Sequence, residues 1–347
     1  MRILFVEHQA DKRIGGMERA ATDISQSLQK LGIEVIRTSS ISDSRKSCPD
    51  IVHFHGLWSI DHLIINDYFR KSRIPIVISP HGMLNNWSLS HNKIRKLVYF
   101  SLFEKQRLLK YSHVLATSRI EEEAINRRVG AKVATVIPLG IDTTIPLIDN
   151  LSAKHRVGCK EDEITLLFLG RIQPEKGLEE VLLALKQLPT WVAKEVNIHL
   201  IIIGQGQPEY ISRLRRLSDS ISDHTRIEWM GPIWDSRKWF YFAAADLFCF
   251  ASYSENFGYS ALEAAYMGTP ILASVYTPWA EVDYKWLSIA IRPSVDSVKQ
   301  GILDFISGFD RWRDTRVERH RWVVDNYSWE TIGLQYEKFY TNILREE

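Results

Sequence analysis

The sequence predicts an α/β protein of two domains, each built on a doubly wound parallel sheet. The chain has 347 residues, which is enough for two domains of ordinary size. Short apolar runs typical of buried parallel strands alternate with helical segments along nearly the whole chain. Two of these strands run into glycine-containing loops that open helices, an arrangement suited to phosphate groups.

The bulk composition excludes several classes of protein. The 44 basic and 42 acidic side chains give a net charge of +2, so we expect no nucleic-acid partner. The three cysteines lie far apart and lack a zinc-binding spacing, which fits a reducing compartment. The opening M-R-I-L-F-V-E-H is typical of a strand rather than a signal peptide, and no apolar run approaches the ~20 residues of a spanning helix. We therefore expect a cytoplasmic protein, soluble or peripheral at the inner face of the membrane.

The first half of the chain opens with a strand, Arg2–Glu7, which runs into a loop containing Gly15 and Gly16. A helix then follows from about Met17. Glycines let the backbone approach a phosphate, and a helix start offers N–H groups to it, but a plain pair of loop glycines explains the loop equally well. The alternation continues with strands near 34–38, 50–56, 74–79, 113–117 and 133–138 and helices near 61–71, 92–110 and 119–129.

Histidines stand at the ends of two of these strands: His53 and His55 on one, and His81 after the next. A structural or solvated histidine is the ordinary interpretation. His81 lies between Pro80, which stiffens the chain, and Gly82, which permits an unusual turn, and this favours a functional role. A His-x-His pair with no third ligand does not indicate a metal site.

In the second half, low-propensity residues from 139 to 151 interrupt the periodicity and suggest an inter-domain segment. We expect domains at 1–145 and 146–326, followed by a terminal helix at 327–347. The predicted strands are 164–169, 198–204, 226–230, 247–251, a run after Pro270, and 288–292. The predicted helices are 177–188, 209–217, 236–244, 257–267, 295–307, 312–326 and 329–344.

Two cations, Arg171 and Lys176, flank a loop between a strand end and a helix start. The arginine fork grips phosphate oxygens, lysine adds a point charge, and the helix start adds N–H groups, so the arrangement suits a diphosphate. Ordinary surface charge is the alternative.

Two carboxylates, Glu255 and Glu263, follow the apolar strand at 247–251. Ligands of open α/β sheets bind beyond the carboxyl ends of the strands, and carboxylates accept hydrogen bonds from sugar and ribose hydroxyls. The alternative is a solvated helix with two surface glutamates. Ala261, Leu262 and Ala264 beside Glu263 suit close helix packing better than a wet face.

These motifs resemble those of the retaining glycosyltransferases of family 4, which have the GT-B fold. The stretch S-E-N-F-G-Y-S-A-L-E-A-A-Y-M-G-T-P resembles their E-x(7)-E signature, and G-R-I-Q-P-E-K-G resembles their G-R-x(4)-K-G motif. The resemblance implies two Rossmann-like domains facing one cleft, with the last helix crossing back to the first domain. The run P-L-G-I-D departs from the family's usual P-N-G-[IV]-D.

The resemblance also implies roles for single residues. Arg171 and Lys176 would bind the donor diphosphate, Glu255 the sugar and Glu263 the ribose. The backbone at Ile233 would read the nucleotide base, and His81 would lie near the donor sugar and the acceptor. Further donor-binding residues would be Gly15, Gly16, Asn256, Phe257 and Gly258. No residue is identified as a covalent nucleophile.

The implied function is transfer of a sugar, hexosyltransferase-type, from a nucleoside diphosphate sugar to a hydroxyl acceptor. A lipid-linked or other precursor glycan in polysaccharide or lipopolysaccharide biosynthesis is the expected acceptor. We expect no cofactor, and no metal, because the chain lacks an Asp-x-Asp pair. The alternatives are a nucleotide-sugar epimerase of the same fold and a non-catalytic nucleotide-sugar-binding protein.

The segment 91–110 carries six Lys or Arg residues against one Glu, interleaved with Tyr and Phe. A basic helix with aromatic residues can lie on an anionic membrane surface. The alternative is a core-packed helix with a solvated basic face.

Overall fold

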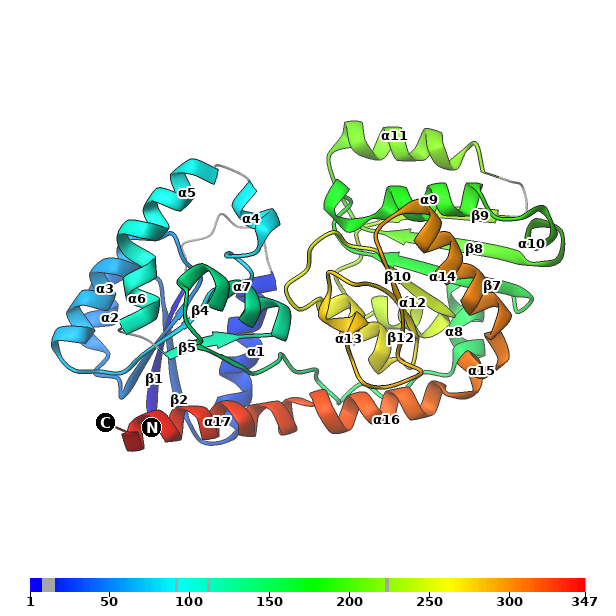
Figure 1. The fold of residues 1–347 in the computed structure, drawn as a ribbon. Helices are drawn as coiled ribbons and strands as arrows, with labels where there is room; N and C mark the ends of the chain where they lie inside the picture. Colours follow the sequence, from blue (N-terminus) through cyan, green and yellow to red (C-terminus); the bar gives the residue numbers. More distant parts are fainter. Residues whose placement is uncertain (8–15, 91–92, 111–112, 222–224, 347) are drawn as a thin grey trace. The chain divides into compact units, whose positions relative to one another are not determined.

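The computed structural model describes residues 1–7, 16–90, 93–110, 113–221 and 225–346. The chain divides into two compact units, each described below by itself (Figure 1). Unit 1 comprises residues 1–142 and 326–347, and unit 2 comprises residues 143–325.

Unit 1 is a six-stranded parallel sheet in the order β2-β1-β3-β4-β5-β6. Its strands are β1 (Arg2–Glu7), β2 (Glu34–Thr38), β3 (Ile51–His55), β4 (Ile76–Ser79), β5 (His113–Ala116) and β6 (Ala134–Val136). Its helical segments before the break are α1 (Gly16–Lys30), α2 (Ile41–Lys46), α3 (Ile60–Lys71), α4 (Asn86–Ser90), α5 (Lys93–Tyr99), the π-helical η1 (Phe100–Glu104), α6 (Lys105–Lys110) and α7 (Arg119–Val129). Strands β1, β3 and β4 are almost wholly buried, as their apolar runs predict.

Local sequence signals fix the helix ends in unit 1. Serines cap α3 and α7 at their starts: Ser59 accepts a hydrogen bond from the His62 N–H, and Ser118 accepts one from the Glu121 N–H. Gly130 ends α7 in a left-handed conformation, with φ of 85°.

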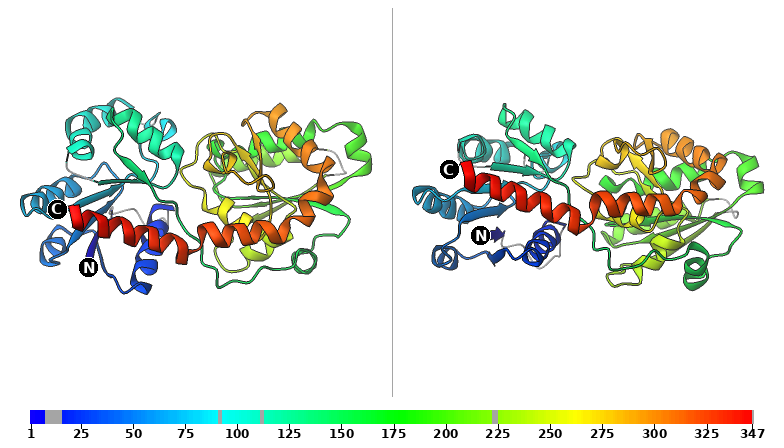
Figure 2. Two further views of the ribbon diagram at one scale, coloured as in Figure 1. Left: turned by 60° about the horizontal axis from the view of Figure 1, so that its bottom comes forward. Right: turned by 90° about the horizontal axis from the view of Figure 1, so that it is seen from below.

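The terminal helix α17 (Trp329–Glu346) completes unit 1 by packing on α1 (Figure 2). A Cβ atom at Gly333 would lie 2.2 Å from the Ser27 Oγ, so the close approach of these helices depends on glycine. The Tyr340 hydroxyl lies 2.8 Å from the His53 Nδ1 on β3. Ile141 donates its N–H to the Tyr327 carbonyl (2.8 Å) and accepts from the Trp329 N–H (3.1 Å). These bonds join the two places where the chain leaves unit 1 and returns to it.

Unit 2 is a second six-stranded parallel sheet, in the order β12-β11-β10-β7-β8-β9. Its strands are β7 (Glu163–Leu169), β8 (Asn197–Ile203), β9 (Thr225–Gly231), β10 (Leu247–Phe250), β11 (Ile271–Ser274) and β12 (Ser288–Ile291). Its helices are α8 (Asn150–Val157), η2 (Pro174–Lys176), α9 (Leu178–Lys186), α10 (Thr190–Glu195), α11 (Pro208–Ser218), α12 (Lys238–Ala244), α13 (Tyr259–Tyr266), η3 (Pro278–Ala280), α14 (Val295–Ser307), α15 (Phe309–Asp314) and α16 (Arg316–Tyr327).

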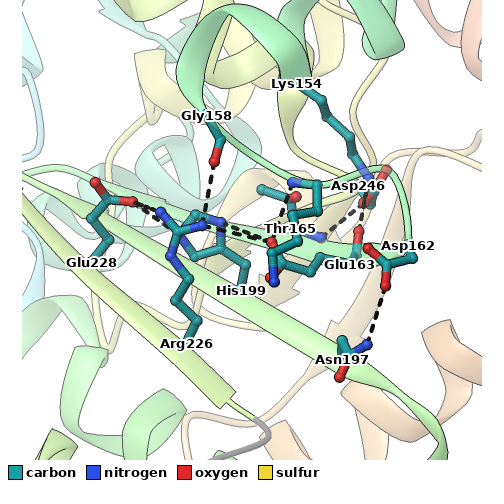
Figure 3. Close-up of polar contacts among 11 residues, drawn as sticks. Lys154, Gly158, Asp162, Glu163, Thr165, Asn197, His199, Arg226, Glu228 and Asp246 are labelled. Carbon is teal, nitrogen blue, oxygen red and sulfur yellow. Dashed lines mark hydrogen bonds and ion pairs between the residues drawn. The ribbon is translucent and has the colours of Figure 1, made fainter.

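A polar cluster closes the amino end of the unit 2 sheet (Figure 3). The Lys154 ammonium lies 2.7 Å from Asp246, whose carboxylate also accepts the Thr165 N–H at 2.8 Å. Nearby, His199 on β8 lies 3.1 Å from Glu228 on β9. Lys154 and Asp246 are buried and paired, as buried charges need to be. The amino end of the sheet is therefore filled by buried polar side chains, most of which pair with one another.

The predicted fold class is confirmed, since both sheets are parallel and doubly wound. Helices α2, α4, α8 and α10 were not predicted, because each has at most eight residues and little apolar periodicity. The predicted helix 312–326 is divided at Thr315 between α15 and α16. No helix among the described residues is long and apolar enough to cross a membrane.

Candidate functional site

The loops after β7 and β10 meet at the carboxyl end of the unit 2 sheet, because these strands are neighbours. Gly177 has φ of 69°, and a Cβ there would lie 2.1 Å from the Ala251 carbonyl oxygen, so only glycine allows this approach. The Tyr253 N–H donates to the Glu175 carbonyl at 2.8 Å. The loop that carries the G-R-x(4)-K-G motif and the loop that begins the E-x(7)-E motif are therefore packed directly against each other.

Lys176 and Glu255 contact each other directly across this junction. The Lys176 Nζ lies 2.6 Å from the Glu255 Oε2, and the two side chains are only 13% and 19% exposed. The Glu255 Oε1 accepts the N–H of Asn256 at 3.4 Å. A cation and a carboxylate thus lie side by side at the carboxyl end of the unit 2 sheet.

Arg171 lies closer to solvent. Its Nη2 lies 2.8 Å from the Glu175 Oε1, and its side chain is 63% exposed. An exposed pair of this kind contributes little free energy, so the guanidinium can turn toward a phosphate at small cost.

The turn from Asn256 to Gly258 is held from two sides. The Trp279 Nε1 donates to the Phe257 carbonyl at 2.6 Å. Gly258 has φ of 83°, and a Cβ there would lie 2.6 Å from the Phe250 ring. This rigidity fixes the position of Glu255 relative to α13.

Glu263 on α13 is buried, with 2% of the residue exposed. Its Oε1 lies 2.6 Å from the Lys238 Nζ, and the Lys238 side chain is 19% exposed. Lys238 opens α12, after the loop that carries Ile233. Each predicted site carboxylate is therefore paired with a lysine.

In unit 1, His81 follows β4 with φ of 52°, a left-handed conformation rare outside glycine. Its Nε2 lies 2.9 Å from the Nδ1 of His55. The next residue, Gly82, donates its N–H to the Glu121 Oε1 at 2.6 Å. Burial lowers the pKa of His81 to about 4, and it holds the pKa values of His53 and His55 well below 6.5. All three imidazoles are therefore neutral at neutral pH.

Most of the predicted glycine loop after β1 lies outside the described residues. Gly15 lies outside the described residues, and Gly16 opens α1. Among the described residues, no group of three or more His, Cys, Asp or Glu side chains could hold a metal ion.

Family models match most of the chain. One, described as "Glycosyl transferases group 1", matches residues 151–312, and another, "Glycosyltransferase Family 4", matches residues 36–145. The chain belongs to glycosyltransferase family 4. This is a family of retaining enzymes, and the expectation drawn from the two motifs is confirmed.

Among curated relatives of this family 4 chain, a D-inositol 3-phosphate glycosyltransferase from Xylanimonas cellulosilytica is 28% identical over 214 residues, or 58% of this chain and 50% of the relative. An alpha-monoglucosyldiacylglycerol synthase from Streptococcus pneumoniae is 26% identical over 234 residues, or 65% of this chain and 51% of that protein. The chain thus spans about half the length of the curated relatives it matches.

The GT-B fold is confirmed by likeness to a solved structure. The Anabaena protein Alr3699/HepE, solved in complex with UDP and glucose, superimposes with a TM-score of 0.75. It is 18% identical, and the match covers 99% of this chain and 100% of that one.

Lys238, which pairs with the predicted site residue Glu263, was not singled out from the sequence. It is a single lysine at a helix start, 25 residues before its partner, and no motif includes it. Its place just beyond the carboxyl end of β9 was the available signal.

Proposed function

We propose that this family 4 protein transfers a hexosyl group from a UDP-sugar to a hydroxyl acceptor, with retention at the anomeric carbon. The observation that carries the proposal is the 2.6 Å contact of Lys176 with Glu255 at the carboxyl end of the unit 2 sheet. It sets a cation suited to the diphosphate beside a carboxylate suited to sugar hydroxyls. Choosing UDP rests on the Anabaena structure, which was solved with UDP.

In this mechanism, negative charge develops on the leaving diphosphate as the glycosidic bond breaks. Arg171 and Lys176 would stabilise that charge, each contributing on the order of 2–4 kcal/mol in a water-excluded site. Glu255 would orient the sugar and Glu263 would accept from the ribose. The neutral His81 imidazole would contact the donor sugar without adding charge. We propose that no metal takes part.

For the acceptor, we propose a lipid-linked molecule at an anionic membrane surface. Ile94, Val98 and Leu102 are 81%, 53% and 65% exposed, and their four-residue spacing puts them on one face of the helical segment 93–110. Phe103 beside them is 47% exposed. A merely solvated helix face would be polar, whereas this face is apolar and flanked by basic residues. The pneumococcal relative, named for a glucosylated diacylglycerol, fits such an acceptor.

The basic face of this segment is smaller than the sequence suggested. Arg107 is 3% exposed and lies 3.1 Å from the fully buried Glu104, and it also donates to Asn66 at 3.0 Å. Arg107 therefore cannot contact a membrane. Glu104, the one acidic residue of the segment 93–110, is buried with Arg107. The exposed face of the segment therefore carries no acidic side chain.

The donor is tested by incubating the pure protein with a panel of nucleoside diphosphate sugars and measuring nucleotide release. We expect release from a UDP-hexose that rises when a lipid-linked acceptor is added. A rearranged nucleotide sugar without an acceptor would indicate an epimerase, and binding without turnover of any sugar would indicate a binding protein.

The membrane surface is tested by sedimentation with vesicles that contain anionic lipid. Replacing Ile94, Val98 and Leu102 with serine should abolish co-sedimentation at low salt and leave UDP binding intact. Leu334→Ser, at a residue of α17 that is 54% exposed, is the matched control and should sediment like the unaltered protein. If the unaltered protein stays in the supernatant, the acceptor is a soluble molecule.

A further inference from the structure

His55 and His81 form a hydrogen-bonded pair at the carboxyl end of the unit 1 sheet. Strands β3 and β4 are neighbours, with His55 opposite Ser79, so His81 follows two residues after the partner of His55. The two rings lie 5.2 Å apart between centroids and are inclined by only 14°. The His55 Nδ1 and the His81 Nε2 are 2.9 Å apart, which leaves Nδ1 as the ring nitrogen of His81 that can meet a ligand.

His81 is held in the left-handed backbone conformation, which is unfavourable for a residue with a side chain. A non-glycine residue at φ of 52° carries a cost of about 1–3 kcal/mol and persists where neighbours over-determine it. Here β3 holds the ring through His55, and α7 holds the following peptide through the bond from Gly82 to Glu121. Two separate elements thus fix one side chain at the ligand end of the sheet.

The surroundings of His55 indicate which of the two imidazoles is the donor in the hydrogen bond between His55 and His81. His55 is fully buried, with its ring centroid 4.6 Å from Phe5 and 4.2 Å from His53. Its Nε2 has no hydrogen-bond partner among the described residues. If His81 were the donor, neutral His55 would carry its own proton on Nε2, as a buried N–H without an acceptor among residues 1–7, 16–90 and the rest of the described chain. Orphaned buried N–H groups are rare, so His55 donates from Nδ1 and only a lone pair remains on Nε2.

We propose that His55 is a positioning residue that fixes His81 as the tautomer protonated on Nδ1. His81 then presents an N–H to an oxygen of the bound nucleotide sugar and acts as a hydrogen-bond donor rather than a base. The identity of this ligand rests on the proposed function, whereas the tautomer of His81 does not.

The tautomer is measured by nuclear magnetic resonance on protein labelled with ¹⁵N-histidine, using long-range proton–nitrogen correlations near pH 7. The signals of His81 are assigned by their loss in His81→Asn. We expect Nδ1 of His81 to be protonated and Nε2 to be the acceptor nitrogen. His81 protonated on Nε2 in the unaltered protein would overturn the proposal, whatever reaction the protein carries out.

Turnover tests the same pair through two variants. His55→Leu removes the donor, and His55→Asn keeps an N–H near the place of Nδ1. We expect His55→Leu to lower kcat on the order of 10- to 100-fold through misplacement of His81, with UDP affinity unchanged, and His55→Asn to recover most of the loss. If both variants reach full kcat, His55 does not position His81. If His55→Leu does not fold, an altered His81 tautomer in folded His55→Asn, which keeps the donor N–H, refutes the inference. If the unaltered protein turns over no nucleotide sugar, the proposed function fails, and the tautomer measurement still decides the pair.

Discussion

Replacing Glu255 with glutamine should tighten the binding of a nucleoside diphosphate while it removes most turnover. In the structure, the Lys176 ammonium lies 2.6 Å from the Glu255 carboxylate, and both side chains are largely buried. A diphosphate that reaches Lys176 must compete with this carboxylate for the ammonium and is also repelled by its charge. Glutamine has the same shape, still accepts a hydrogen bond, and carries no charge.

The size of the effect follows from the change in this one contact. Lys176 is charged in both variants, so glutamine keeps a hydrogen bond to the ammonium and removes only the attraction between the two charges, which contributes about 0.2–1 kcal/mol in an exposed ion pair and more where water is partly excluded. A glutamine therefore holds Lys176 less tightly by about 1 kcal/mol, which corresponds to roughly a fivefold gain in UDP affinity. Turnover falls because Glu255 is the residue proposed to orient the sugar.

Calorimetric titration of UDP into each variant measures the effect. Glu175→Gln is the matched control, because Glu175 pairs with the exposed Arg171 and such pairs contribute little. We expect that control to change UDP affinity by less than about 0.5 kcal/mol. Unchanged or weaker UDP binding by Glu255→Gln would refute the competition between Glu255 and the diphosphate.

Four further outcomes are expected. Lys176→Ala should weaken UDP binding by about 1–3 kcal/mol, as titration will show, and unchanged affinity would remove Lys176 from the diphosphate site. Gly177→Ala should lower the free energy of unfolding by more than about 3 kcal/mol, because alanine would have to adopt φ of 69° and its Cβ would lie 2.1 Å from the Ala251 carbonyl oxygen. The control Gly158→Ala, at φ of 76° with no atom in reach of the new Cβ, should lower it by about 1–2 kcal/mol. The free energy of unfolding of unit 1, measured in urea, should fall as the pH drops from 6.5 toward 4, because His81 binds a proton in the unfolded chain over this range and, with its pKa of about 4, does not in the folded protein. His81 alone should lower that free energy by about 2 kcal/mol between pH 7 and pH 5, and equal stability at the two pH values would contradict the expectation. Transfer activity should persist in EDTA, and rescue of lost activity by magnesium would show that a metal takes part.

The sequence predicts the strands of both sheets well, because parallel strands buried on both faces are continuous apolar runs. The alanines around Glu263 correctly indicated packing, and the structure finds this carboxylate buried. The roles assigned to the site residues stay predictions.

Long-range pairing was beyond sequence reasoning. Nothing local indicates that Lys238 meets Glu263 or that His55 meets His81, since each pair joins two different elements. Arg107 was misread as part of a basic surface, because a count of charges does not show which face of a helix is buried. Its burial follows from contacts with Glu104 and with Asn66 on α3.

The return of α17 to unit 1 has a consequence for how the chain folds as it is synthesised. Unit 2 is continuous in sequence, and all of its residues are synthesised before α17. Unit 1 is still incomplete at that point, because the helix that brings Tyr340 to His53 and packs Gly333 against Ser27 follows unit 2 in the chain. A chain truncated before residue 326 and released would therefore resist protease in unit 2 and remain sensitive in its first 142 residues.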